Sequence, residues 1–116
     1  LEFRRVLFRS LSPTREHCEQ FLSWAKTVPD DAVVLVHCEA GVSRSTASAL
    51  CILVQARGVD KIDECIQELV AVRPQACPNP IITQFCDEIL GCGGELHTKA
   101  EAVANAKLLK NFGRIA

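Results

Sequence analysis

The sequence predicts an α/β domain in which a parallel sheet is flanked by helices around a strand–loop–helix core. Residues 32–37 form a continuous apolar, β-branched run, typical of a strand buried on both faces of a parallel sheet. A short loop and a small-residue helical pattern follow within about 25 residues. Since one strand alone leaves its backbone groups unpaired, we expect this sheet to be incomplete, with its partner strands upstream.

The first segment carries weak structural signal. Residues 1–10, "LEFRRVLFRS", match one translated reading frame of a common sequencing adapter, so we expect an artefact of gene assembly there rather than an edge strand. The chain then divides into three parts, residues 1–10, 11–92 and 93–116. The last part is expected to be a peripheral helical tail.

Helical patterns account for most of the remaining chain. Ser12 and Pro13 are suited to start a helix over residues 13–27, which "VPDD" ends. A second helix is predicted over 45–56, with Gly58 as its stop, and a third begins where Asp60 caps it. The prolines of "RPQACPNP" end that third helix.

Two further helices are predicted near the C-terminus. One covers about residues 80–90, buried through Ile81, Ile82, Phe85 and Ile89, and ends at Gly91. The other covers about residues 97–111, which are rich in alanine and lysine.

Composition limits the class of protein. The 116 residues carry a net charge of −1 and no apolar run of about 18 residues, so neither nucleic acid nor a membrane is an implied partner. The first residues lack the features of a secretory signal, and a cytoplasmic location is expected. The pattern says nothing about the oligomeric state.

The chain contains seven cysteines. Their number is odd and most lie on apolar helix faces, which favours buried, reduced thiols over a disulfide framework. No pair has Cys-x-x-Cys spacing and the histidines are scattered, so no metal site is predicted.

The loop after the strand is the candidate site. In residues 38–44, "CEAGVSR", backbone N–H groups and the start of the next helix would converge on one point, which suits a tetrahedral dianion. Such surroundings lower a thiol pKa from about 8.5 to about 3.5–7.5, so Cys38 is predicted to be a thiolate. The planar Arg44 guanidinium would bind two oxygens of a phosphoryl group, and Gly41 permits close backbone approach.

Neighbouring residues have predicted supporting roles. His37 would hold the loop through a ring hydrogen bond, and Ser45 would donate to the Cys38 sulfur and assist its departure from a phosphocysteine. Ser43 and Thr46 would only stabilise the turn, or they occur here because serine and threonine cap helix starts. Capping is an equal explanation for Ser43 and the better one for Thr46. Glu39 is by default a solvated loop charge.

The segment "VLVHCEAGVSRSTA" resembles the signature loop of the cysteine-dependent protein tyrosine phosphatases, His-Cys-(five residues)-Arg-Ser/Thr, and is most similar to their dual-specificity branch. "RPQACPNPIITQFCDEIL" is also similar to that branch, with Arg73, Pro78 and Asn79 at the corresponding positions. The small size and the "GCGGEL" tail resemble small bacterial members. The resemblance identifies residues 11–92 as the C-terminal part of a catalytic domain.

The resemblance implies hydrolysis of phosphomonoesters on phosphotyrosine or phosphoserine/threonine proteins, without metal or cofactor. Cys38 is the nucleophile, with Arg44 and Ser45 catalytic and His37 and Asn79 supporting. The implied phosphate-binding residues are Glu39, Ala40, Gly41, Val42, Ser43 and Arg44. The family's general-acid aspartate is expected about thirty residues before Cys38, which places it upstream of Leu11. Asp30 and Asp31 are poor substitutes, because they lead into the strand at the end opposite the loop.

Other functions remain open at this point. A catalytically impaired phosphate-binding module is the main alternative, since the general acid is not visible. A rhodanese-type sulfurtransferase is disfavoured by the five residues between Cys38 and Arg44. A buried structural cysteine is the plain explanation for Cys51, Cys65 and Cys86, and a redox partnership of Cys51 or Cys77 with Cys38 has little support.

Overall fold

The computed structural model describes residues 3–7, 13–29, 33–37 and 43–115. Its elements in chain order are β1 (Phe3–Leu7), α1 (Arg15–Thr27), β2 (Val33–His37), α2 (Arg44–Arg57), a 3-10 turn η1 (Val59–Lys61), α3 (Ile62–Val72), α4 (Pro80–Leu90) and α5 (Glu95–Ile115).

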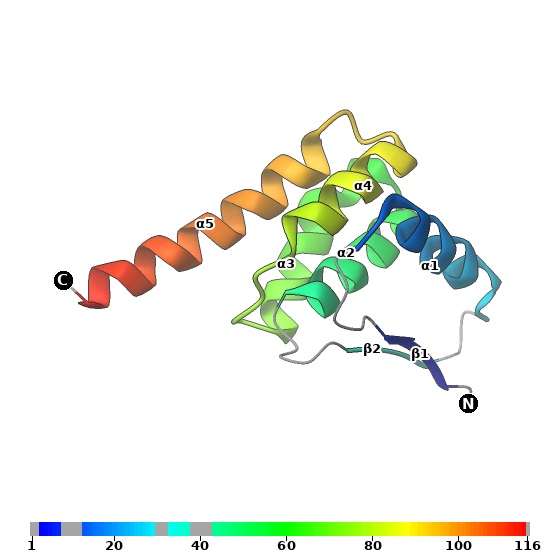
Figure 1. Cartoon of the computed structure of the whole chain (residues 1–116), viewed down its shortest axis with the longest axis horizontal. Helices are drawn as coiled ribbons and strands as arrows, with labels where there is room; N and C mark the ends of the chain where they lie inside the picture. The colour runs from blue at the N-terminus through cyan, green and yellow to red at the C-terminus, as the bar shows by residue number, and fades with distance from the viewer. Residues whose placement is uncertain (1–2, 8–12, 30–32, 38–42, 116) are drawn as a thin grey trace.

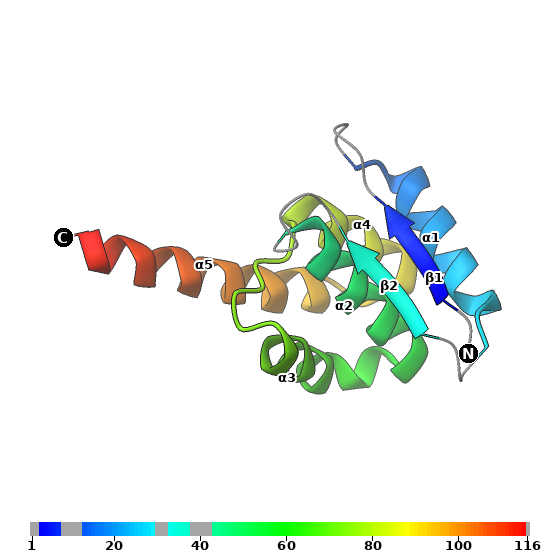
Figure 2. The same cartoon turned by 90° about the horizontal axis from the view of Figure 1, so that it is seen from below.

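The predicted fold class is wrong. The described chain is mostly helical, and its two short strands lie on one side of a group of helices instead of forming a sheet flanked by them (Figures 1 and 2). The physical reason is visible in the core, which is formed by residues of α1–α5 and the turns between them. These helices bury their apolar faces mainly against one another.

The strand predicted over 32–37 is present as β2, and it pairs with β1. The two strands are parallel, with Phe3 opposite Val33 and Leu7 opposite His37. The expectation that no strand forms within residues 1–10 is therefore wrong, because parallel pairing with β2 supplies the backbone partners that β2 lacks alone. Whether this segment derives from an adapter stays a separate prediction.

α2 lies at the centre of the helical group. It contacts α1, α3, α4 and β2. The predicted stop at Gly58 is confirmed: its φ is 111°, and a Cβ there would lie 2.7 Å from Asp60 Oδ1. Asp60 lies in η1, and its predicted role as the cap of α3 is wrong, since the N-cap residue is Lys61 and no side chain caps α3.

α4 begins and ends where the sequence predicts. Asn79 is its N-cap and Gly91 its left-handed C-cap, with φ 71°. Ile82 is fully buried, and Phe85 and Ile89 pack against the core. Ile81 is 43% exposed, so its predicted burial is wrong. It directly follows Pro80, in the first turn of a helix whose inner face is already filled by Ile82 and Cys86.

A side chain of α4 accepts hydrogen bonds from the backbone at the start of α5. The buried carboxylate of Asp87 accepts the backbone N–H groups of Gly94, at 2.7 Å, and His97, at 2.9 Å. These two bonds satisfy donors that a helix start leaves without intrahelical partners. The predicted tail helix is thus longer than 97–111, and its far half extends away from the other helices (Figure 1).

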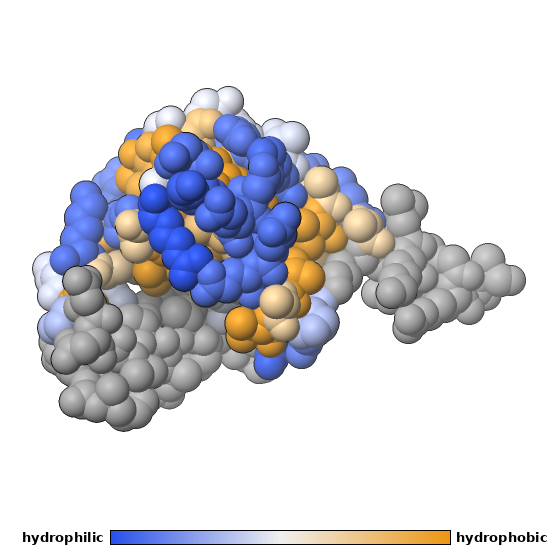
Figure 3. Space-filling model, turned by 180° about the vertical axis from the view of Figure 1, so that it is seen from behind, coloured by the Kyte–Doolittle hydropathy of each residue, from blue (hydrophilic) through white to orange (hydrophobic). Residues whose placement is uncertain are grey.

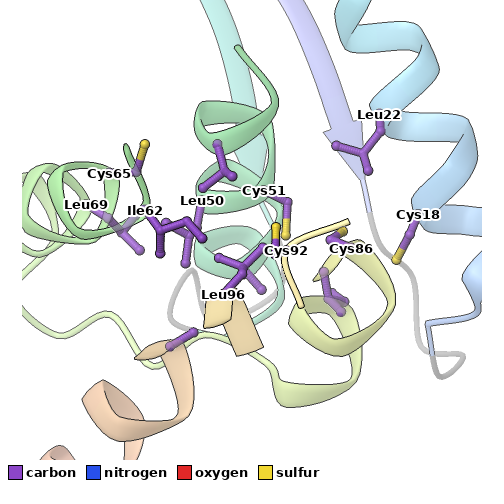
Figure 4. Packing of buried hydrophobic residues seen from close by; sticks show 14 of the residues in the cluster. Cys18, Leu22, Leu50, Cys51, Ile62, Cys65, Leu69, Cys86, Cys92 and Leu96 are labelled. Atoms are coloured by element: carbon purple, nitrogen blue, oxygen red, sulfur yellow. The ribbon is translucent and has the colours of Figure 1, made fainter. Parts of the chain in front are cut away.

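Thiols from four parts of the chain meet in the core (Figure 4). Cys18, Cys51 and Cys86 are fully buried and Cys92 is 8% exposed. The six described cysteines are free thiols, as predicted, and Cys77 is the one among them that is partly exposed.

One face of the surface is largely hydrophilic, with smaller apolar areas between its polar residues (Figure 3). Among the residues whose side chains the structure describes, the large apolar side chains that stay exposed are Val59, Val72 and Ile81. Within the described part of the chain, no helix is long and apolar enough to cross a membrane.

Candidate functional site

The predicted loop joins the end of β2 to the start of α2. β2 ends at His37 and α2 begins at Arg44. The predicted roles of Cys38, Glu39, Ala40, Gly41 and Val42 lie outside the described residues, as does the side chain of His37. The described part of the site is Ser43 and the first turns of α2.

Arg44 is the first residue of α2 and is partly buried. A helix start carries partial positive charge and N–H groups without intrahelical acceptors. Arg44 therefore adds a full positive charge where the helix already favours an anion. This combination is suited to binding a phosphoryl group.

Ser43 is the N-cap residue of α2, but its side chain makes no capping hydrogen bond. The capping explanation of Ser43 is therefore wrong. Its backbone carbonyl is instead a meeting point of donors: it accepts from Ala47 N at 3.1 Å, Thr46 Oγ1 at 3.0 Å and Asn79 N at 3.1 Å.

Three hydroxyl residues of the first two turns of α2 are buried. Ser45 and Thr46 are each 5% exposed, and Ser48 is fully buried. The Thr46 hydroxyl donates to the Ser43 carbonyl, in agreement with a role in the turn, and the Ser48 hydroxyl donates to the Arg44 carbonyl at 2.9 Å. Ser48 is not among the site residues predicted from the sequence. Its spacing of four from Arg44, in a helix of small residues, is the signal that would have found it.

Asn79 connects this region to α4. Its backbone N–H binds the Ser43 carbonyl, and its side-chain oxygen accepts from Ile81 N at 2.9 Å and Ile82 N at 3.2 Å. The structure thus brings four predicted site residues into one region: Ser43, Arg44, Ser45 and Asn79. Asn79 fixes the start of α4 and the end of the loop at the same time.

The thiols of Cys18, Cys86 and Cys92 in the core are poor nucleophiles, because their pKa values are raised. A hydrogen bond from Cys18 to Cys86, followed by burial, raises the pKa of Cys18 far above its ordinary value. For Cys86 the bond received from Cys18 lowers the pKa, but the bond it donates to Cys51 and its burial outweigh this and raise it. Burial, with Asp87 and Glu95 nearby, raises the pKa of Cys92 to about 11. These thiols stay protonated at neutral pH.

Among the described residues, no group of three or more histidine, cysteine, aspartate or glutamate side chains is arranged to hold a metal ion.

Comparison with known proteins gives one match. The chain is 38% identical over 63 residues to dual specificity protein phosphatase 19 of Mus musculus, which covers 54% of this chain and 27% of that protein. No family model and no solved structure matches. The chain thus spans about a quarter of the curated relative, and the similarity supports a relationship to the dual-specificity phosphatases.

Proposed function

We propose that this chain hydrolyses phosphomonoesters, with phosphorylated proteins as its substrate class, through a phosphocysteine on Cys38. The observation that carries the proposal is Arg44, six positions after Cys38 and at the first position of α2. A guanidinium and a helix start at the end of the loop would together hold the phosphoryl oxygens. The similarity to a dual-specificity phosphatase supports the same reaction class.

The reaction has two steps. The Cys38 thiolate attacks phosphorus, an S–P bond forms, and the bond from phosphorus to the leaving oxygen breaks. Water then attacks phosphorus, the S–P bond breaks, and inorganic phosphate and the thiolate are released. Arg44 and the loop N–H groups stabilise the charge that develops on the phosphoryl oxygens in both steps. Ser45 would donate to the departing sulfur.

The decisive experiment measures the alkylation rate of the Cys38 thiol and does not depend on turnover. Cys38 should be alkylated by iodoacetate at a pH of about 6, where an ordinary thiol is protonated, and phosphate or vanadate should slow that alkylation. Cys77 is the matched control, because it is a free and partly exposed thiol of the same chain. Peptide mass spectrometry reports both rates in one sample.

Turnover is the second measurement. Wild-type protein should hydrolyse p-nitrophenyl phosphate, Cys38→Ser should abolish that hydrolysis, and Cys77→Ser should retain it. Alkylation of Cys38 no faster than that of Cys77 would overturn the proposal. Protection by phosphate without turnover would instead favour the phosphate-binding module, and release of sulfite from thiosulfate and cyanide would favour the sulfurtransferase.

A further inference from the structure

The helix α5 leaves the helical group along its length. Leu96 and Ala100 in its first turns are fully buried, whereas Asn105 and Ala106 are exposed. The helix continues without a break to Ile115 and extends away from the other helices (Figures 1 and 2). We refer to residues 105–115 as the α5 arm.

The large apolar residues of the α5 arm recur at helical spacing. Leu108, Phe112 and Ile115 are four and three positions apart, which places them on one side of the helix. Leu109 borders the same side. This pattern is typical of a helix that buries one side against an apolar environment.

The charges of the α5 arm have one sign. Lys107, Lys110 and Arg114 are three and four positions apart, on the side of the helix opposite Phe112. The sequence from residue 102 to residue 116 contains no aspartate or glutamate. The net charge of −1 for the whole chain averages out this local excess of positive charge.

A basic amphipathic helix matches the surface of an anionic membrane. Leucine and phenylalanine on its apolar side can enter the boundary between headgroups and acyl chains, and lysine and arginine are attracted to anionic headgroups. A second copy of this chain is a poorer match, because a coiled coil needs about three or four heptads and the arm is shorter than two. Two arms with positive charge alone would also repel each other.

We propose that the α5 arm binds anionic phospholipid and lies in the plane of the membrane surface, with its apolar side toward the acyl chains and its basic side toward the headgroups. The proposal does not depend on the proposed phosphatase function. It assigns the arm to a lipid surface and leaves the helical group in water.

The test is sedimentation of the full chain, under reductant, with lipid vesicles. One set of vesicles is phosphatidylcholine alone, and the other is an equimolar mixture of phosphatidylcholine and phosphatidylserine. We expect binding to the mixed vesicles to be tighter by at least about tenfold, because three cations meet an anionic surface. Raising the salt concentration should weaken that binding.

Two pairs of variants separate the apolar and the basic contributions. Phe112→Gln should weaken binding to the mixed vesicles roughly tenfold, since one large apolar side chain no longer leaves water. Val72→Gln is its control, because Val72 is 78% exposed at the end of α3, and it should bind as the wild type does. Glutamine is a good helix former, so the arm should stay helical.

The second pair changes the net charge equally at two places. Lys107→Gln with Lys110→Gln should weaken binding to the mixed vesicles at least about fivefold. Lys26→Gln with Lys61→Gln removes two exposed lysines of other elements and should have little effect.

The outcomes distinguish the lipid surface from the other occupants. No binding to mixed vesicles, or equal binding by Phe112→Gln and the wild type, would overturn the proposal. So would a dimer in sedimentation velocity without lipid that Phe112→Gln abolishes, since the apolar side would then face a second copy. Hydrolysis of p-nitrophenyl phosphate is measured in the same samples, and its absence would count against the proposed function alone.

Discussion

Arg44 and Arg57 mark the two ends of α2 and carry the same side chain in different surroundings. Arg44 opens the helix at the end of the candidate loop, whereas Arg57 closes it in an exposed ion pair with Glu68. Lysine retains the charge but loses the planar fork that binds two oxygens at once. Replacing each arginine by lysine therefore separates the effect of guanidinium geometry on catalysis from the effect of charge alone, with Arg57 as the control position.

Arg44→Lys should lower kcat/KM for p-nitrophenyl phosphate by at least about 10²-fold, the usual cost of losing a donor to a transition-state oxyanion. Arg57→Lys should leave it unchanged. Steady-state kinetics on both proteins, with melting temperatures measured alongside, check this. Equal kinetics for Arg44→Lys and wild type would contradict the role assigned to Arg44.

Residue-level prediction succeeded where short-range spacing decides the outcome. The stops at Gly58 and Gly91 follow from local backbone requirements and are confirmed. Ile81 and Asp60 are the two residues for which local patterns were not enough. The burial of Ile81 depends on which face of α4 meets the core. Asp60 does not cap α3, because it lies in the 3-10 turn that precedes that helix. The roles predicted for Cys38 to Val42 stay predictions.

At the scale of the helices, Asn79 connects the start of α4 to the residue before α2, through its side chain and its backbone N–H respectively. Its side chain caps α4, and its backbone N–H binds the last loop residue. Asn79→Ala should destabilise the protein by about 0.5–2 kcal/mol, because two N–H groups lose their acceptor. Asn79→Ser retains a capping oxygen and should recover most of that loss. Urea unfolding measures both, and equal stabilities would contradict the capping role.

Asp87 performs a similar task for α5 from outside that helix. Asp87→Ala should cost about 1.5–3 kcal/mol, since two charge-assisted bonds to backbone N–H groups are lost at a buried position. Glu88→Ala is the neighbouring control: Glu88 is half exposed and pairs with Arg15 at 2.7 Å, so roughly 0–1 kcal/mol is expected. Chemical unfolding of both variants checks the difference, and equal losses would refute it.

At the scale of the whole molecule, the fold class differs from the predicted one: the described chain is mostly helical and its sheet has two short strands. A continuous apolar run correctly marked β2, but strand pairing depends on contacts between distant segments that no local pattern encodes. The helical patterns were strong and their positions were largely right. What the sequence did not reveal is that the helices would bury their faces mainly on each other, so that the sheet stays a minor element.

The protonated core thiols predict the response of the whole molecule to alkali. The pKa of an unfolded thiol is about 8.5. Burial raises the pKa of Cys92 in the folded protein to about 11, and the pKa values of Cys18 and Cys86 are raised as well. Above the unfolded value the folded state therefore holds more protons, and the free energy of unfolding falls as pH rises. Each such thiol contributes a slope of up to about 1.4 kcal/mol per pH unit.

Urea unfolding under reductant between pH values of about 8 and about 10 measures this slope. Cys92→Ala should reduce it by up to one thiol's share. A free energy of unfolding that stays flat across this range would contradict the burial of these groups.

The same cluster of thiols ties chemical survival to the folded state. While the chain is native, Cys18, Cys51 and Cys86 are sealed from solvent oxidants; once it opens, all become reactive together and can crosslink between molecules. Heating and cooling in air should therefore be irreversible, and should become reversible when dithiothreitol is present. The rate at which the folded chain opens therefore sets the rate at which Cys18, Cys51 and Cys86 are oxidised.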